Sequence, residues 1–191
     1  AAITGVDTTL VLYDVWMDGG GLDLTGGRLD VWSGQFEGAV GPAISLSELG
    51  GTLVDVAFSG WSAERGAAVH AVSTTGHTLA MDGVVATDLT ASDRGGVLWA
   101  SGMTTAASRL DVQAVRSGYG GAIAVGGGTL HLIGASIADT AARVDGGAVW
   151  ATGASVTLSG VDGVGPVGVA AERGGLVHIE GGSLTLAEAS A

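Results

Sequence analysis

One short pattern recurs along the whole chain: a glycine-rich turn, then an aliphatic residue, a variable residue and a second apolar residue. The first aliphatic positions of the seven copies are Leu22, Ile44, Val69, Leu98, Ile123, Val149 and Val177. They are 22, 25, 29, 25, 26 and 28 residues apart, the differences between these residue numbers. The second apolar positions are Leu24, Leu46, Ala71, Ala100, Val125, Ala151 and Ile179. Such alternation predicts a strand with one buried face, and its recurrence every ~25 residues predicts a repeat fold.

A second apolar alternation follows within each copy, and a half-copy that begins at Ile3 precedes the first one. The inward pairs expected there are Leu10 with Leu12, Leu29 with Val31, Leu79 with Met81, Leu130 with Leu132, Val156 with Leu158, and Leu184 with Leu186. The two remaining copies fit with a shift, at Leu53 to Val56 and at Leu110 to Val112. A third short apolar stretch leads to the next glycine turn, as at residues 136–138 and 167–169.

Three short strands in each copy leave no room for a helix, so each strand must pair with the equivalent strand of the next copy. Copies that stack about 4.8 Å apart with their strands in one direction form a parallel β-helix, and parallel crossover connections are right-handed. We therefore predict an all-β, right-handed, single-stranded parallel β-helix of about seven coils. Residues 1–191 form one domain, as a segment of a longer repeat protein or as a stacking subunit. A β-sandwich or an antiparallel barrel would instead need hairpin turns about every 8 to 12 residues.

The charge balance limits the partners of this chain. The seven basic residues are all arginine and face 19 acidic residues, which gives a net charge of −12. Such a surface repels phosphate backbones and anionic lipids, so we expect no nucleic acid as partner. The absence of cysteine excludes disulfides, thiol catalysis and cysteine-ligated zinc. We expect no cofactor. We also expect no membrane insertion of this segment, because no apolar run is long enough to span a bilayer.

Some glycine turns carry a more specific pattern. Residues 120–123 and 146–149 read Gly-Gly-Ala followed by Ile or Val, and residues 95–98 and 174–177 match more loosely. Before another copy, Phe58 is followed by Trp61. This arrangement resembles the repeat of the chlamydial polymorphic membrane proteins, in which a GGA(I/L/V) motif follows an FxxN motif. The asparagine of the second motif is missing, since the chain contains no asparagine.

The resemblance implies a pectin-lyase-like solenoid that serves as an autotransporter passenger or adhesin. It also implies an extracellular location, on the surface of a bacterium as an outer-membrane passenger. The partner of such a passenger is a surface protein or a glycan of a host cell or of a neighbouring cell.

Two carboxylates are candidates for metal binding. Asp30 and Asp55 occupy expected outward positions of the second strand in successive coils. There they would lie about 5 Å apart, which is close enough to share a cation. The alternative is that the two carboxylates are separately solvated, and we expect no metal elsewhere.

The variable position of the first strand holds the candidate binding residues His70, Trp99, Trp150 and His178. They point outward because they stand between the two inward positions of their strand. Aromatic rings in one column can stack on sugars or anchor a protein partner. The alternative is that loops or a neighbouring domain cover the rings.

The sequence does not favour catalysis. Gly76-His77 lacks the second glycine of a Gly-His-Gly segment, and no two aspartates are adjacent. The arginines at positions 65, 94 and 173 each precede a glycine turn, which indicates corner packing rather than a catalytic base. We therefore predict a non-catalytic structural or adhesive module: a stalk, an adhesin or an assembly subunit capable of end-to-end self-association. The alternatives are a β-helix that binds or cleaves polysaccharides and a self-assembling fibre protein.

Overall fold

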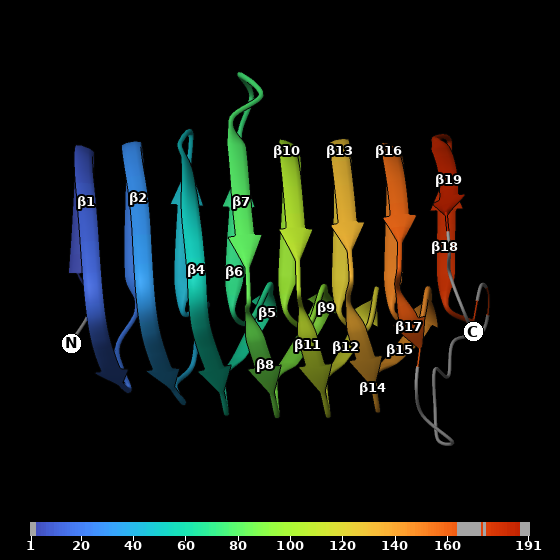
Figure 1. Ribbon diagram of the computed structural model, residues 1–191, viewed down its shortest axis with the longest axis horizontal. Coiled ribbons are helices and arrows are strands. Elements are labelled where there is room, and N and C mark those ends of the chain that lie inside the picture. Colours follow the sequence, from blue (N-terminus) through green and yellow to red (C-terminus); the bar gives the residue numbers. More distant parts are fainter. Residues whose placement is uncertain (1–2, 164–172, 174, 188–191) are drawn as a thin grey trace.

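The structure, a computed structural model, describes residues 3–163, 173 and 175–187. Every regular secondary-structure element among these residues is a β-strand (Figure 1). The strands are β1 (Ile3–Asp18), β2 (Leu22–Glu37), β3 (Ile44–Ser47), β4 (Gly50–Ser59), β5 (Ser62–Arg65), β6 (Val69–Val72), β7 (Thr78–Asp82), β8 (Val85–Thr87), β9 (Thr90–Arg94), β10 (Leu98–Ser108), β11 (Asp111–Gln113), β12 (Arg116–Tyr119), β13 (Ile123–Ile133), β14 (Ser136–Ala138), β15 (Ala141–Asp145), β16 (Val149–Ser159), β17 (Asp162–Gly163), β18 (Val177–Glu180) and β19 (Ser183–Ala187). They form a 15-stranded sheet and a 4-stranded sheet. Every pairing between strands is parallel, so the predicted parallel β-helix is confirmed.

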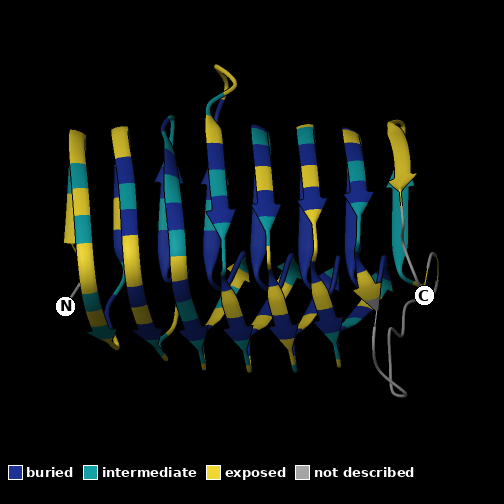
Figure 2. Cartoon of the chain, in the orientation of Figure 1, coloured by how far each residue is buried: buried dark blue, intermediate teal, exposed yellow. Residues whose placement is uncertain are grey.

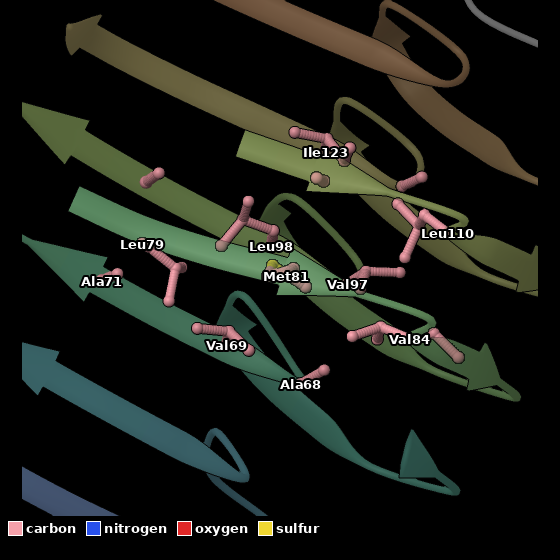
Figure 3. Packing of buried hydrophobic residues seen from close by; sticks show 14 of the residues in the cluster. Ala68, Val69, Ala71, Leu79, Met81, Val84, Val97, Leu98, Leu110 and Ile123 are labelled. Carbon is pink, nitrogen blue, oxygen red and sulfur yellow. The ribbon is translucent and has the colours of Figure 1, made fainter. Parts of the chain in front are cut away.

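The first strands of the coils stack in one file, as the sequence predicts. The register places Ile3, Leu22, Ile44, Val69, Leu98, Ile123, Val149 and Val177 side by side. From Leu22 to Val149 these side chains are at most 1% exposed, and Figure 3 shows Val69, Leu98 and Ile123 on successive strands of the interior. Burial of each such side chain stabilises the fold by about 1.5–3 kcal/mol.

The chain completes six turns between Ile3 and Val149, one for each step of that file. Residues 164–172 lie outside the described residues, and the file continues where Val177 pairs with Val149. The third apolar stretch expected at residues 167–169, and Gly174 of the last glycine turn, also lie outside the described residues. The stretch expected at residues 136–138 is strand β14.

The second file differs from the prediction in two coils. Its register reads Leu10, Leu29, Gly51, Leu79, Thr105, Leu130, Val156 and Leu184. Leu53 does lie inward beside Val31, but Gly51 and Thr105 hold the places where an aliphatic residue was expected. The assignment of residues 110–112 to the second strand is therefore wrong. They lie on the third side of the coil, where Val112 pairs with Ala86 and Ile137.

One corner uses the same backbone conformation in seven successive coils. The residue between the second and third strands has a positive φ in every case, at Asp14, Ser33, Asp55, Gly83, Arg109, Gly134 and Gly160. Only three of these are glycine, because the strands on either side fix the turn and a left-handed residue with a Cβ costs only about 1–2 kcal/mol. The glycine turns before the first strands also hydrogen-bond from coil to coil. For example, the Gly95 N–H donates to the Tyr119 carbonyl at 2.9 Å.

The coils have a fourth side that the sequence did not reveal. Strands β5, β9, β12 and β15 form the separate 4-stranded sheet, in the order β15-β12-β9-β5 (Figure 1). The residue before each strand points inward and is at most 2% exposed; these residues are Trp61, Leu89, Val115 and Thr140. The inward positions within the strands are small, as at Ala91 and Ala142. The alternation of buried and exposed bands along the strands is visible in Figure 2.

A loop of residues 73–77 projects from the coil between β6 and β7, at the top of Figure 1. The Glu48 carboxylate of the preceding coil accepts two hydrogen bonds from Thr74 N–H, at 2.9 and 3.1 Å, and a third from Ser73 Oγ at 3.3 Å. These bonds lower the pKa of Glu48, the bond from the Thr74 backbone most. No helix in the described part of the chain is long and apolar enough to cross a membrane.

Candidate functional site

The predicted outward column exists, and it holds the two tryptophans close to each other. The register places His70, Trp99, Ala124, Trp150 and His178 on neighbouring strands. Trp99 and Trp150 are nevertheless only 5% exposed, and Ala124 between them is fully buried. The three residues form a second hydrophobic cluster outside the main core.

The tryptophan rings are buried because a corner column lies beside them. The residues that precede the glycine turns stack in the order Arg65, Arg94, Tyr119, Asp145 and Arg173. The guanidinium of Arg94 lies 5.2 Å from the ring centroid of Trp99, 5.2 Å from that of Trp150 and 5.9 Å from that of Tyr119. The Tyr119 ring is 5.4 Å from that of Trp150. A cation over aromatic faces contributes roughly 0.5–2 kcal/mol, so this column fastens the corner to the first strands.

Arg94 and Tyr119 were not among the predicted site residues. Their sequence signal was a long side chain directly before four of the seven glycine turns, at positions 65, 94, 119 and 173. The expectation that the arginines serve corner packing agrees with this geometry, since Arg65 Nε also donates to Asp93 Oδ2 at 2.8 Å. Binding by the outward column stays a prediction, and the faces of its two tryptophans are largely occupied by the protein's own side chains.

The two histidines stand at opposite ends of the outward column. His70 is half-buried, and burial followed by the charge of Arg65 lowers its pKa. Its imidazole is therefore neutral at neutral pH. His178 lies 3.3 Å from Glu180, with Nε2 and Oε1 as the nearest atoms. The structure thus separates the histidines by the tryptophan cluster and does not bring them together.

His178 and Glu180 form one side of a polar cluster that Asp145 completes. The ligand atoms of these three residues lie within 4.8 Å of one another, a spacing that a cation would accept. The Asp145 side chain is only 1% exposed, however, and Arg173 donates to both of its oxygens, at 2.9 and 2.8 Å. A bidentate guanidinium already supplies the positive charge that this buried carboxylate requires. The cluster therefore fits an ion-pair network rather than a metal site.

The expected neighbourhood of Asp30 and Asp55 is wrong. Asp30 is opposite Thr52 in the register and accepts a hydrogen bond from Arg28 Nε at 2.7 Å. Asp55 occupies the left-handed corner after the second strand, where its nearest cation is Arg109 at 3.6 Å. Asp55 lies three residues beyond Thr52, the residue opposite Asp30, so the two carboxylates do not occupy the same column and cannot share a cation there.

Asp82 has the strongest set of partners among the partly exposed carboxylates that the structure describes. It accepts hydrogen bonds from Ser108 Oγ at 2.7 Å and from Arg109 Nε and Nη2 at 2.9 and 2.6 Å. The bonds from Arg109 and then from Ser108 lower the pKa of Asp82 to about 2. All three side chains lie at the corner between the second and third strands, so this arrangement ties two coils together.

No protein-family model matches this chain, and a search of the curated proteins finds no match. The resemblance to the chlamydial repeat therefore stays a prediction from the sequence.

Proposed function

We propose that the protein is a non-catalytic, surface-exposed β-helix that acts as a stalk, adhesin or assembly subunit outside a bacterial cell. The observation that carries this proposal is the unbroken stack of coils. Eight first strands share one register, and at about 4.8 Å for each layer they form a rod about 34 Å long.

A rod of this kind suits display because its core does not depend on the side chains that point outward. Each coil contacts mainly the coils before and after it, so outward residues can vary without loss of the interior. The described carboxylates with the closest partners, at positions 30, 82, 93 and 145, are each held by an arginine. That arrangement supports a structural role for them rather than the converging acid and base of a hydrolase or lyase.

The experiment is an adhesion assay combined with an activity assay. Purified protein is offered to bacterial and host cell surfaces and, separately, to neutral and acidic polysaccharides with and without calcium. We expect saturable attachment to at least one surface and no new reducing ends or unsaturated products. Turnover of any polysaccharide would replace this proposal with the enzyme alternative, and absence of attachment to every surface would remove the adhesive role.

A further inference from the structure

The arginines divide into two groups. Five of the seven form ion pairs with acidic side chains: Arg28, Arg65, Arg94, Arg109 and Arg173. Arg116 and Arg143 form none with any residue that the structure describes. On a chain with 19 acidic residues, two arginines without a carboxylate partner in the described part of the chain stand out. They also belong to adjacent strands, β12 and β15 of the 4-stranded sheet.

Arg116 and Arg143 line the same hollow. A shallow concavity of about 310 Å³ crosses strands β9, β12 and β15, and its lining includes Thr90, Ser92, Arg116, Ala141 and Arg143. Thr90, Ser92 and both arginines are exposed. A second concavity of about 370 Å³ shares Thr90 and Ser92 and continues to β5. The two form one trough across the 4-stranded sheet, and no described acidic side chain lines its arginine end.

Arg143 points outward by the ordinary alternation of β15, since Ala142 before it is buried and Arg143 is exposed. Ser117 pairs with Ala142, but Tyr119 pairs with Asp145, so β15 contains one residue more than β12 between these points. An extra residue of this kind is left out of the ladder and turns its side chain away from the regular direction. The extra residue falls at Arg143 or Val144, next to Gly118 of β12, where a Cβ would overlap the carbonyl oxygen of Asp93 on β9.

We propose that Arg116 and Arg143 bind the carboxylate or sulfate group of an acidic glycan in this trough. Two like charges on adjacent strands repel each other, and an anion between them removes that repulsion. Guanidinium groups match the planar, two-oxygen geometry of a carboxylate, and they bind sulfate oxygens in the same way. This proposal names the ligand class for the adhesive role proposed above and rests on that role.

The floor of the trough favours a sugar over a protein as ligand. Beside the arginines it offers the hydroxyl groups of Thr90 and Ser92 and the small side chain of Ala141. Sugar hydroxyls can exchange hydrogen bonds with such groups. Protein interfaces are instead organised around buried aromatic or large aliphatic anchors, and the arginine end has no side chain of that kind among its lining residues.

The test measures binding by calorimetry with four probes of equal length. They are a uronic-acid hexasaccharide, its methyl ester, a sulfated hexasaccharide without carboxylates, and a hexamer of aspartate. The protein is used as the full chain and in two double variants. Arg116→Gln/Arg143→Gln removes the proposed site, and Arg28→Gln/Arg109→Gln removes the same charge from other sides of the coil. Circular dichroism confirms that each variant is folded.

We expect the uronic-acid probe, the sulfated probe or both to bind, the ester and the aspartate hexamer not to bind, and the site variant to lose at least about tenfold in affinity. The control variant should stay within about twofold of the wild type. The proposal is overturned if no charged sugar binds, if the ester or the peptide binds equally well, or if both variants lose the same affinity. Comparison of the two charged sugars identifies carboxylate or sulfate as the anion. Binding with turnover would keep the ligand class and remove the non-catalytic role.

Discussion

The 15-stranded sheet and the 4-stranded sheet enclose the same core by different means. In the first, β10, β13 and β16 are 11 residues long and the first-strand file is filled by large aliphatic side chains such as Ile123. In the second, the strands have 4 or 5 residues, the register shifts by one residue, and the inward positions are as small as Ala91 and Ala142. The difference teaches that a repetitive interior can coexist with one irregular side, and the proposed ligand trough lies on that side.

The junction between the two sheets is the place where a substitution should do most damage. A Cβ at Gly121 would overlap the carbonyl oxygen of Gly147 on the next coil, and two backbone atoms of Ala141 also lie within 3.1 Å of it. We expect Gly121→Ala to lower the free energy of unfolding by more than about 4 kcal/mol, measured by urea denaturation. Gly134→Ala is the control, because its Cβ meets nothing within 4 Å and only its φ of 59° is unfavourable. It should cost about 1–2 kcal/mol, and equal losses would contradict the steric explanation.

The next prediction compares the interiors of the two sheets directly. Ile123→Ala removes a fully buried side chain from the first-strand file and should cost about 2–5 kcal/mol. Ala142→Gly removes the corresponding inward group of the 4-stranded sheet and should cost about 1 kcal/mol. Denaturation curves with equal slopes measure both values. If Ala142→Gly proved as costly as Ile123→Ala, the contrast drawn between the two sheets would be wrong.

A smaller effect of opposite sign is expected at two threonines, one in β10 of the larger sheet and one directly before β15 of the smaller sheet. Thr105 and Thr140 are fully buried, and neither Oγ1 has a hydrogen-bond partner among the residues that the structure describes. Because valine has the same shape without a hydroxyl group, Thr105→Val and Thr140→Val should each stabilise the protein by about 1 kcal/mol. Thr157→Val, at a partly exposed position, should change the stability little. A loss of stability in either buried variant would indicate that the hydroxyl is satisfied in solution.

The smallest effect concerns the ion pairs at the corner of the larger sheet. The pKa of Asp82 is about 2 in the folded chain against an ordinary value of 3.8. A lowered carboxyl pKa means that the contribution of Asp82 is present above pH 3.8 and is lost as the pH falls toward 2. NMR titration of the Asp82 carboxyl should show this low pKa, and Arg109→Gln should raise it toward the ordinary value. An unchanged pKa in that variant would contradict the role given to Arg109.

The sequence revealed the regular sheet and not the irregular one, for a physical reason. In the first-strand file every position is Leu, Ile or Val, so the alternation marks both the strand and its inward face. In the second file Gly51 and Thr105 interrupt the run of aliphatic residues. The sequence therefore placed the second strands of these two coils at the nearby aliphatic residues 53–56 and 110–112. The 4-stranded sheet carries mainly Ala and Ser at its inward positions, which give no apolar alternation to detect.

The candidate site was predictable only in part. The sequence placed Trp99 and Trp150 in one column because both follow a glycine turn at the same distance. It could not show that Arg94 covers both rings, since that contact joins a corner to a neighbouring strand. Nor could it show that Arg116 and Arg143 share a trough, because the strands that carry them were not recognised.

The projecting loop at residues 73–77 has a consequence for engineering and for evolution. Val72 pairs with Ser101 and Thr78 pairs with Thr104, so five residues connect the two ladders where the adjacent coil uses two. The ladders on both sides continue in register despite the difference. Peptide tags or fluorophores could therefore be inserted in this loop and held at a fixed position along the axis of the β-helix. By the same small insertion, natural homologues could acquire new binding loops.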